Sequence, residues 1–302
     1  MKRQFLMLAH DANELKLPSD WFVSEKLDGV RAWWDGGISR GNATSLVPWA
    51  NTIKDKVETI ATGLWSRYGK VIYAPSWWLN ELPPVSLDGE LWISRQQFQA
   101  TVSTVKKHNP IDLEWRQIKF MVFDSPPYQT ILENGLIDVP NMCKYIQGGL
   151  NFAVGKITEP LPFWRVVKML ENIPQNEVLK IHLQQIVEPW ARLDGINQLG
   201  GEGIMLRNPD SFWMPERSHN LLKLKPFKLG VGTVVDWEPG KGKYEGMLGS
   251  LTVQFVAGTF NLSGFTDDER QLPCRFAVGS AVRFKYRELT DDGLPKEARY
   301  LR

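Results

Sequence analysis

The last quarter of the chain limits the possible folds most. After Phe227 the sequence consists of short β-rich runs, such as GVGTVVDWEP, GSLTVQFV and SAVRFKYREL, separated by turns rich in Gly and Asp. Several short strands in so small a region predict a barrel or a sandwich. We therefore expect a domain boundary near residues 227–230, with one domain at 1–227 and an all-β domain at 228–302.

The first domain mixes strands and helices. Strands are predicted at WFVSE, PPVSLDGELWIS, IKFMVFDSP, GIMLRNP and NLLKLKPF, and helices at RQQFQATVSTVKKHN and FWRVVKMLENI. VRAWW and ISRGN flank Asp35-Gly36-Gly37, which predicts a hairpin. Ile53, Val57, Ile60 and Leu64 are spaced as on one face of an amphipathic helix, so residues 49–68 are predicted to be helical.

Composition excludes several classes of protein. Two cysteines cannot form a disulfide framework or a four-cysteine zinc module, and they favour a reduced compartment. The apolar run Phe5 to Ala9 is too short for a signal peptide, and no run reaches the roughly 20 residues of a membrane span. We expect a monomer in the cytoplasm, without membrane contact. The formal net charge of +2 neither requires nor excludes nucleic acid.

The loop SEKLDGVR places Lys26, Asp28 and Arg31 close together after a predicted strand. A solvated charged turn is the plainest interpretation, because most lysines are exposed. A catalytic lysine is the alternative. A lysine nucleophile has to lose its proton, and its reference pKa of about 10.4 is lowered by neighbouring cations or a metal.

Other segments carry residues suited to phosphoryl transfer. Asp88 and Glu90 lie in LDGEL, Phe123 lies beside Asp124 in FMVFD, and Glu202 lies between glycines in GGEGIML. In LLKLK, Lys223 and Lys225 are two residues apart, which places them on one face of a strand. Carboxylates suit Mg²⁺, an aromatic ring can stack on a purine, and paired lysines can stabilise phosphate charge. Each residue alone could equally be a strand-edge charge, a core aromatic or a solvated lysine.

Taken together and in order, the segments KLDGVR, SRGN, LDGEL, FMVFD, GEGIML and KLK resemble the ATP-dependent DNA ligases of the minimal bacterial and phage type. These enzymes belong to the covalent nucleotidyltransferases. The resemblance covers most of residues 20–230 and continues more weakly to residue 302. It implies an α+β fold: a nucleotidyltransferase (ATP-grasp-like DNA ligase adenylation) domain followed by an all-β OB-fold barrel. Residues 44–70 resemble an insertion, either a DNA-clamping element or a surface decoration.

The resemblance also implies the reaction. Lys26 would attack the α-phosphate of ATP and form lysyl-AMP, and the AMP would then pass to DNA as a DNA-adenylate. Glu90 would bind the ribose and Phe123 would stack on adenine. Lys223 and Lys225 would bind the α-phosphate.

The remaining implied roles concern metal and DNA. Glu202, with Glu90, would hold Mg²⁺, for which Mn²⁺ could substitute. The substrate would be duplex DNA with a 3′-OH/5′-phosphate nick. The resemblance implies that Arg31 and Arg40 contact the nucleotide and the DNA, and Arg217 matches a family arginine expected to bind DNA. Because the barrel has to supply part of the DNA contact, its basic residues Lys241, Lys243 and Lys285 are further DNA-binding candidates. The terminal DGLPKEARYLR departs from the family pattern at Glu297-Ala298, which leaves the roles of Lys296 and Arg302 open.

Three alternatives remain at this stage. An mRNA-capping guanylyltransferase uses the same lysine logic with GTP, and an RNA ligase usually lacks the Asp-Gly pair. A nick-binding protein without catalysis is a third, and the full set of Lys26, Glu90, Glu202, Lys223 and Lys225 argues against it. NAD⁺-dependent ligases are disfavoured by the absence of a four-cysteine zinc site, since the sequence has two cysteines, and of an extra N-terminal domain before the Lys26 loop.

Overall fold

The protein divides into two compact units. The computed structural model describes residues 6–12, 16–51, 59–127, 160–271 and 275–302. The units are Met1–Leu224 and Lys225–Arg302. Cys143 and Cys274 lie outside the described residues. In the described part of the chain, no helix has both the length and the hydropathy to cross a membrane.

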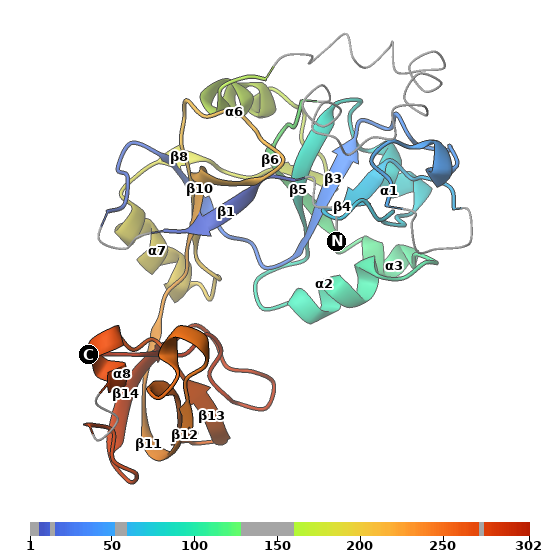
Figure 1. The fold of residues 1–302 in the computed structure, drawn as a ribbon. Coiled ribbons are helices and arrows are strands. Elements are labelled where there is room, and N and C mark those ends of the chain that lie inside the picture. The colour runs from blue at the N-terminus through green and yellow to red at the C-terminus, as the bar shows by residue number, and fades with distance from the viewer. Residues whose placement is uncertain (1–5, 13–15, 52–58, 128–159, 272–274) are drawn as a thin grey trace. The chain divides into compact units, whose positions relative to one another are not determined.

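The first unit contains two five-stranded sheets (Figure 1). The first sheet has the order β1-β10-β9-β2-β8 and is antiparallel except for the parallel pair of β1 and β10. Its strands are β1 (Leu8–Asp11), β2 (Phe22–Glu25), β8 (Gln185–Ile186), β9 (Ile204–Arg207) and β10 (Arg217–Leu224).

The second sheet of this unit has the order β4-β3-β5-β6-β7, and only β6 and β7 are parallel. Its strands are β3 (Val30–Asp35), β4 (Leu64–Ser66), β5 (Ser86–Trp92), β6 (Lys119–Asp124) and β7 (Leu179–Ile181). Side chains alternate between the two faces of a strand. Ala32 and Trp34 of β3 and Leu87 and Leu91 of β5 therefore enter one apolar core. The opposite face carries Arg31, Asp88 and Glu90, and also Trp33, which packs into a second core.

Helices cover the outer faces of both sheets. α2 packs against β3 and β5, α6 against β6, and α7 against β2 and β9. The helices of this unit are η1 (Thr44–Leu46), α1 (Ser76–Asn80), α2 (Phe98–Val105), α3 (Asp112–Trp115), α6 (Phe163–Glu171) and α7 (Pro189–Gln198). Of the three helices predicted from the sequence, those at RQQFQATVSTVKKHN and FWRVVKMLENI correspond to α2 and α6.

Two local predictions are wrong. ISRGN does not form the second strand of a hairpin, because β3 instead pairs with β4 and β5. The Asp35 carboxylate closes a turn by accepting hydrogen bonds from Gly37 N (2.9 Å) and from Ser39 Oγ. Residues 49–68 are predicted to be helical, but Leu64–Ser66 form strand β4, in which Leu64 pairs with Trp34. Residues 52–58 of this segment lie outside the described residues.

The described part of segment 44–70 contributes side chains to the core of the domain, although Leu46 and Ile60 are exposed. Trp49 and Trp65 are buried with Trp33 in a tryptophan-rich core, where the Trp33 and Trp49 rings are 5.1 Å apart and nearly perpendicular. Leu64 is fully buried in the neighbouring core. This segment therefore contributes to the stability of the second sheet.

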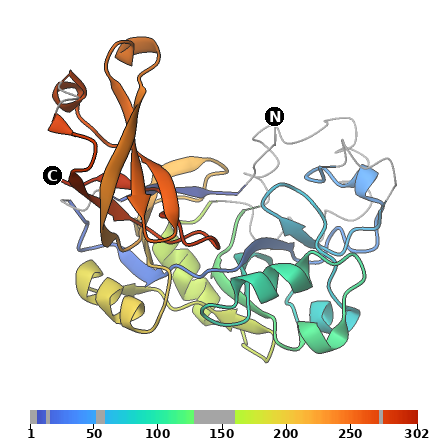
Figure 2. The same cartoon turned by 90° about the horizontal axis from the view of Figure 1, so that it is seen from below.

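The second unit is an antiparallel sheet with the order β13-β12-β11-β14-β15. Its elements are β11 (Lys228–Pro239), η3 (Gly242–Tyr244), β12 (Leu248–Phe255), β13 (Gly258–Leu262), α8 (Asp267–Gln271), β14 (Ala281–Tyr286) and β15 (Arg299–Tyr300). The long pair of β11 and β12 twists strongly (orange in Figure 2). A parallel bridge from Ser263 to Arg299 joins the two edges, so the sheet closes into a barrel around Phe284 and Val253.

Candidate active site

Strand pairing brings Lys26 and Glu202 together. β2 ends one residue before Lys26, β9 begins two residues after Glu202, and the strands are antiparallel with Glu25 opposite Ile204. Lys26 N donates to Gly203 O (2.8 Å), which continues the ladder by one bond. The Lys26 ammonium then forms an ion pair with Glu202 Oε2. Two segments 176 residues apart thus meet at the predicted nucleophile.

The polar face of the second sheet supplies Arg31, Asp88 and Glu90. Arg31 lies opposite Glu90 in the pairing of β3 with β5. Its guanidinium donates twice to Asp88, Nε to Oδ1 at 2.6 Å and Nη2 to Oδ2 at 2.5 Å. Burial lowers the pKa of Arg31, but the carboxylates of Asp88, Glu90 and Asp124 together raise it above the usual value. Gly29, just before β3, has no room for a side chain, because a Cβ would lie 2.4 Å from Leu91 O.

Glu90 joins Lys26, Arg31 and Glu202 in one electrostatic cluster. The residue keeps some exposed surface, but its carboxyl group is surrounded by protein. Burial raises the pKa of Glu90 to about 7; Arg31 and Lys26 oppose this rise, and Asp88 and Glu202 add to it. The charges that act on Glu90 therefore come from both sheets, which places the four side chains around one site.

Phe123 lies on the same side of the second sheet. Its neighbours Phe120 and Val122 enter the apolar core, whereas Phe123 is half-buried. The Arg31 guanidinium lies over the Phe123 ring at 4.7 Å from the centroid, a cation–π distance. A partly exposed aromatic ring beside a fixed cation is suited to binding a planar, anionic ligand.

The other predicted nucleotide-binding residues, Lys223, Lys225 and Arg40, form polar contacts outside the cluster of Lys26, Arg31, Glu90 and Glu202. Lys223 lies in β10 opposite Met205, with its ammonium 3.5 Å from Asp11. Lys225 follows the end of β10 and belongs to the second unit, where it is 3.6 Å from Glu288. Arg40 lies in the turn after β3 and donates to Asn80 Oδ1 at the end of α1 (2.7 Å).

The predicted DNA-binding residues are distributed over both units. Arg217 begins β10 and donates to Ala9 O. In the second unit, Lys241 precedes η3, and Lys243 lies 3.6 Å from Asp267, with both side chains about two-thirds exposed. Lys285 lies on β14, with its ammonium 4.2 Å from the centre of the Phe227 ring. At the terminus, Arg302 Nε donates to Glu269 Oε1 (3.0 Å).

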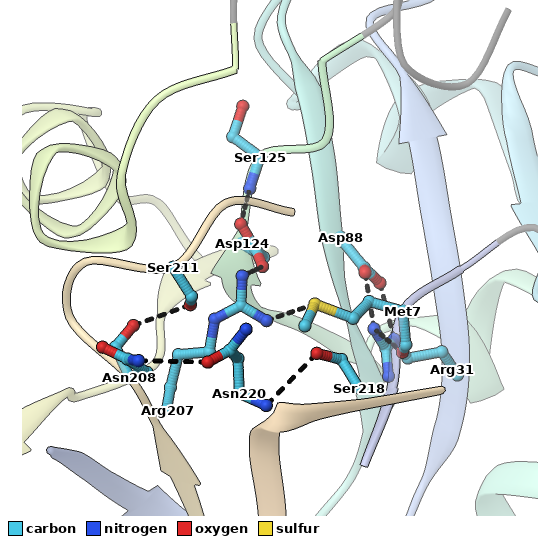
Figure 3. A network of polar contacts seen from close by, with 10 residues as sticks. All are labelled: Met7, Arg31, Asp88, Asp124, Ser125, Arg207, Asn208, Ser211, Ser218 and Asn220. Atoms are coloured by element: carbon cyan, nitrogen blue, oxygen red, sulfur yellow. Dashed lines mark hydrogen bonds and ion pairs between the residues drawn. The ribbon is translucent and has the colours of Figure 1, made fainter. Parts of the chain in front are cut away.

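A buried arginine that the sequence reasoning missed joins the two sheets of the first unit. Figure 3 shows Arg207 of β9 reaching toward Asp124 of β6, with a nitrogen–oxygen distance of 4.0 Å. Arg207 also contacts the Met7 sulfur, and its residue is 4% exposed. Burial disfavours the charged form of both groups: it lowers the pKa of Arg207 and raises the pKa of Asp124 to about 6. The only sequence signal was an arginine ending the apolar run IML.

Hydrogen bonds around Arg207 fix the loops beside it. Asn208 Nδ2 donates to Asn220 Oδ1 (3.0 Å), and Ser211 Oγ donates to Asn208 O (2.7 Å). Asp124 Oδ1 accepts a hydrogen bond from Ser125 N (2.8 Å), as Figure 3 shows. This network holds β9, and therefore the loop with Glu202, against the sheet that carries Arg31 and Glu90.

Comparison with known proteins identifies the family. A DNA ligase of Haemophilus influenzae is 30% identical over 298 residues, which is 98% of this chain and 91% of the relative. The chain belongs to the DNA ligases. A solved Lig E DNA ligase, studied for DNA binding with a minimal scaffold, is also 30% identical (TM-score 0.62, 98% of both chains). The solved structure Pmar-Lig_Pre shares the fold at 21% identity (TM-score 0.57, 99% of this chain and 67% of that one).

The family comparison also covers the second unit. Residues 239–302 of this ligase match the model of the DNA ligase OB-like domain. The predicted architecture, a nucleotidyltransferase domain followed by an OB-fold barrel, is therefore confirmed, as is the predicted resemblance to the DNA ligases.

Proposed function

We propose that this DNA ligase seals 3′-OH/5′-phosphate nicks in duplex DNA with ATP, through lysyl-AMP on Lys26. The observation that carries this proposal is the Lys26–Glu202 ion pair, set beside the partly enclosed pair of Arg31 and Glu90. A lone surface lysine has no such surroundings. A lysine among fixed charges of both signs, next to a half-buried aromatic ring, suits attack on a nucleotide phosphate.

The first step is a phosphoryl-type transfer on the α-phosphorus of ATP. Lys26 Nζ releases a proton to solvent and forms the N–P bond, while the P–O bond to pyrophosphate breaks and its electron pair leaves with pyrophosphate. Phe123 would stack on adenine and Glu90 would hydrogen-bond the ribose. Arg31 and Lys223 would face the anionic part of the nucleotide, and Lys225, which follows β10, would bind the α-phosphate with Lys223.

The carboxylates of the site fit Mg²⁺. Among the described residues, no group of three or more His, Cys, Asp or Glu could hold an ion by itself. Mg²⁺ commonly binds one or two protein carboxylates and completes its shell with phosphate oxygens and water. Glu202 and Glu90 are two such carboxylates, and the ion would supply charge neutralisation on the transferred phosphoryl group.

The OB-fold domain would supply part of the DNA contact. Lys285 and Arg283 lie on the outer face of β14, where exposed and buried positions alternate. The exposed ion pair of Lys243 with Asp267 contributes little, so a DNA phosphate can replace the aspartate. With Lys241, these side chains would contact the backbone of the duplex, together with Arg217 and Arg40 of the first unit.

Labelled nucleotides test the proposal directly. The protein is incubated with Mg²⁺ and α-labelled ATP, α-labelled GTP or adenylate-labelled NAD⁺, and then separated by denaturing electrophoresis. We expect a covalent adduct from ATP alone that pyrophosphate removes, and sealing of a nicked duplex afterwards. An adduct from GTP alone would indicate a guanylyltransferase. Absence of any adduct would leave a nick-binding protein without catalysis.

A further inference from the structure

The residue directly before Lys26 is held unusually firmly. Glu25 ends β2 and is 9% exposed. Arg95 binds its carboxylate with two parallel hydrogen bonds, Nε to Oε1 and Nη2 to Oε2, both at 2.7 Å. A bidentate arginine–carboxylate pair fixes direction as well as distance.

The backbone of Glu25 is held from the other sheet. His182 follows β7, and its Nε2 lies 2.8 Å from Glu25 O. Because a carbonyl oxygen only accepts, Nε2 must carry the proton in this contact. Burial lowers the pKa of His182, which keeps the imidazole neutral. His182 N in turn donates to Val122 O (2.7 Å), so the ring is anchored on β6.

The Glu25 carboxylate also lies against the loop that carries Glu202. A Cβ on Gly201 would be 2.9 Å from Glu25 Oε1 and 2.4 Å from Ile196 Cγ2, so this position has no room for a side chain. A Cβ on Gly200 would be 2.6 Å from Gln96 Nε2. Gln96 itself has φ 64°, a conformation that costs a non-glycine residue about 1 kcal/mol or more and that persists where the surroundings impose it.

We propose that Arg95 and His182 are positioning residues for the nucleophile. With Glu25 they form a unit, here called the Glu25 clamp, that fixes the end of β2 and hence the direction in which Lys26 leaves the sheet. Neither residue needs to touch the nucleotide, because both act through Glu25. The inference rests on the proposed function, since it requires that Lys26 attacks ATP.

The Glu25 clamp matters for one step only. Formation of the N–P bond requires Lys26 Nζ in line with the α-phosphorus, and a misplacement of about 1 Å can cost about 100-fold in rate. Binding of ATP depends on other side chains. Sealing of a nick that already carries AMP does not use Lys26 as a nucleophile. The clamp therefore predicts a selective loss of the rate of lysyl-AMP formation.

Single-turnover kinetics on the full-length protein test this inference. The variants are Arg95→Ala, Arg95→Lys, Glu25→Gln, His182→Ala and His182→Gln. Lys107→Ala serves as the matched control, because Lys107 also forms a two-contact pair, with Glu114 at 2.5 and 2.7 Å. For each protein we measure the maximal rate of adduct formation, the half-saturating ATP concentration, the sealing of a pre-adenylylated nick and the melting temperature.

The expected pattern separates positioning from support of the fold. Arg95→Ala should lower the maximal rate about 100-fold, with an unchanged half-saturating ATP concentration and unchanged sealing of the pre-adenylylated nick. Its melting temperature should fall below that of the control, because the buried Glu25 carboxylate loses its counter-charge. Arg95→Lys should recover little, because an ammonium cannot form both bonds. His182→Gln, which keeps an N–H donor, should retain more rate than His182→Ala. The double variant Arg95→Ala/Glu25→Gln should be no slower than Arg95→Ala alone.

Other outcomes overturn the inference. A parallel fall of adduct formation, sealing and melting temperature would mean that Arg95 and His182 only support the fold. A raised half-saturating ATP concentration at an unchanged maximal rate would mean that they bind substrate. Absence of an adduct from the wild-type protein would overturn the proposed function and the inference with it, whereas the first two results leave that function standing.

Discussion

Arg31 and Asp88 form two hydrogen bonds between neighbouring strands, at 2.6 and 2.5 Å, and the Asp88 side chain is fully buried while that of Arg31 is 19% exposed. Asp88→Ala should therefore lower the free energy of unfolding by about 3 kcal/mol, because it leaves the guanidinium without its counter-charge. Urea unfolding measures this loss. Lys107→Ala, which breaks a more exposed pair, should cost less than about 1 kcal/mol. Equal losses for the two variants would contradict the assignment of Arg31–Asp88 as a structural pair.

Lys26→Ala should abolish adduct formation from ATP, because alanine offers no nucleophile. The variant should still seal a nick that has been adenylylated in advance. Both reactions are measured on one preparation, which makes the second reaction the control for folding. Adduct formation at the wild-type rate would show that another lysine is the nucleophile.

The buried Asp124 predicts a pH dependence of stability. Burial raises the pKa of its carboxyl group from the ordinary 3.8 to about 6 in the folded protein. A raised pKa means that the folded state binds the proton more tightly, so this contribution to stability is complete below pH 3.8 and is lost as the pH rises through 6. Over its full range, this pKa difference contributes about 3 kcal/mol to the free energy of unfolding.

Asp124→Asn removes this titration. The difference in free energy of unfolding between variant and wild type should therefore shift by about 2 kcal/mol in favour of the variant from pH 4 to pH 7. Urea unfolding across this range measures the shift, and its sign is the test, because the variant also loses the ionic contact with Arg207. A constant difference would show that Asp124 has an ordinary pKa.

The sequence predicted the parts of the site that have a local signature. Lys26 and Glu202 each lie in a glycine-containing loop at a strand end. Such loops can be recognised from a short segment of sequence. The strands themselves follow from apolar runs such as IKFMVF. Leu64 illustrates the limit of this reading: its spacing from Ile60 suits a helix, yet tertiary pairing with Trp34 makes it part of a strand.

The missed residues have partners that are distant in sequence. Glu25 meets Arg95 across 70 residues and His182 across 157, and no spacing rule connects such positions. From the sequence alone, Asp88 could be a strand-edge charge. In the structure, the pairing of β3 with β5 places Asp88 beside Arg31. Sequence periodicity specifies which face of a strand is apolar, but it does not specify which polar residues meet on the other face.

Glu202→Ala should slow adduct formation by at least about 100-fold while changing the melting temperature little. A carboxylate that holds Mg²⁺ contributes several kcal/mol to stabilisation of the transition state. Glu202→Gln, which keeps the shape without the charge, is the matched control and should be nearly as slow. A large fall in melting temperature with a mild loss of rate would instead identify Glu202 as a structural partner of Lys26.

The lysines of the OB-fold domain should determine the salt dependence of DNA binding. Each phosphate contact releases counterions, so the logarithm of affinity falls by about 0.9 per logarithm of salt for every contact. The triple variant Lys241→Gln/Lys243→Gln/Lys285→Gln should bind a nicked duplex more weakly at low salt, and its salt slope should be smaller by about 2.7 if all three contact phosphates. Lys107→Gln of the first unit controls for the loss of charge alone and should leave the slope unchanged.

Affinities are measured across a salt series from about 50 to 200 mM with Mg²⁺ replaced by EDTA, so that no sealing occurs. Adduct formation from ATP, which does not require these lysines as nucleophiles, reports whether the triple variant keeps a folded first unit. A slope equal to that of the wild type would show that the DNA backbone is held by other residues, and that Lys243 remains with Asp267 in the complex.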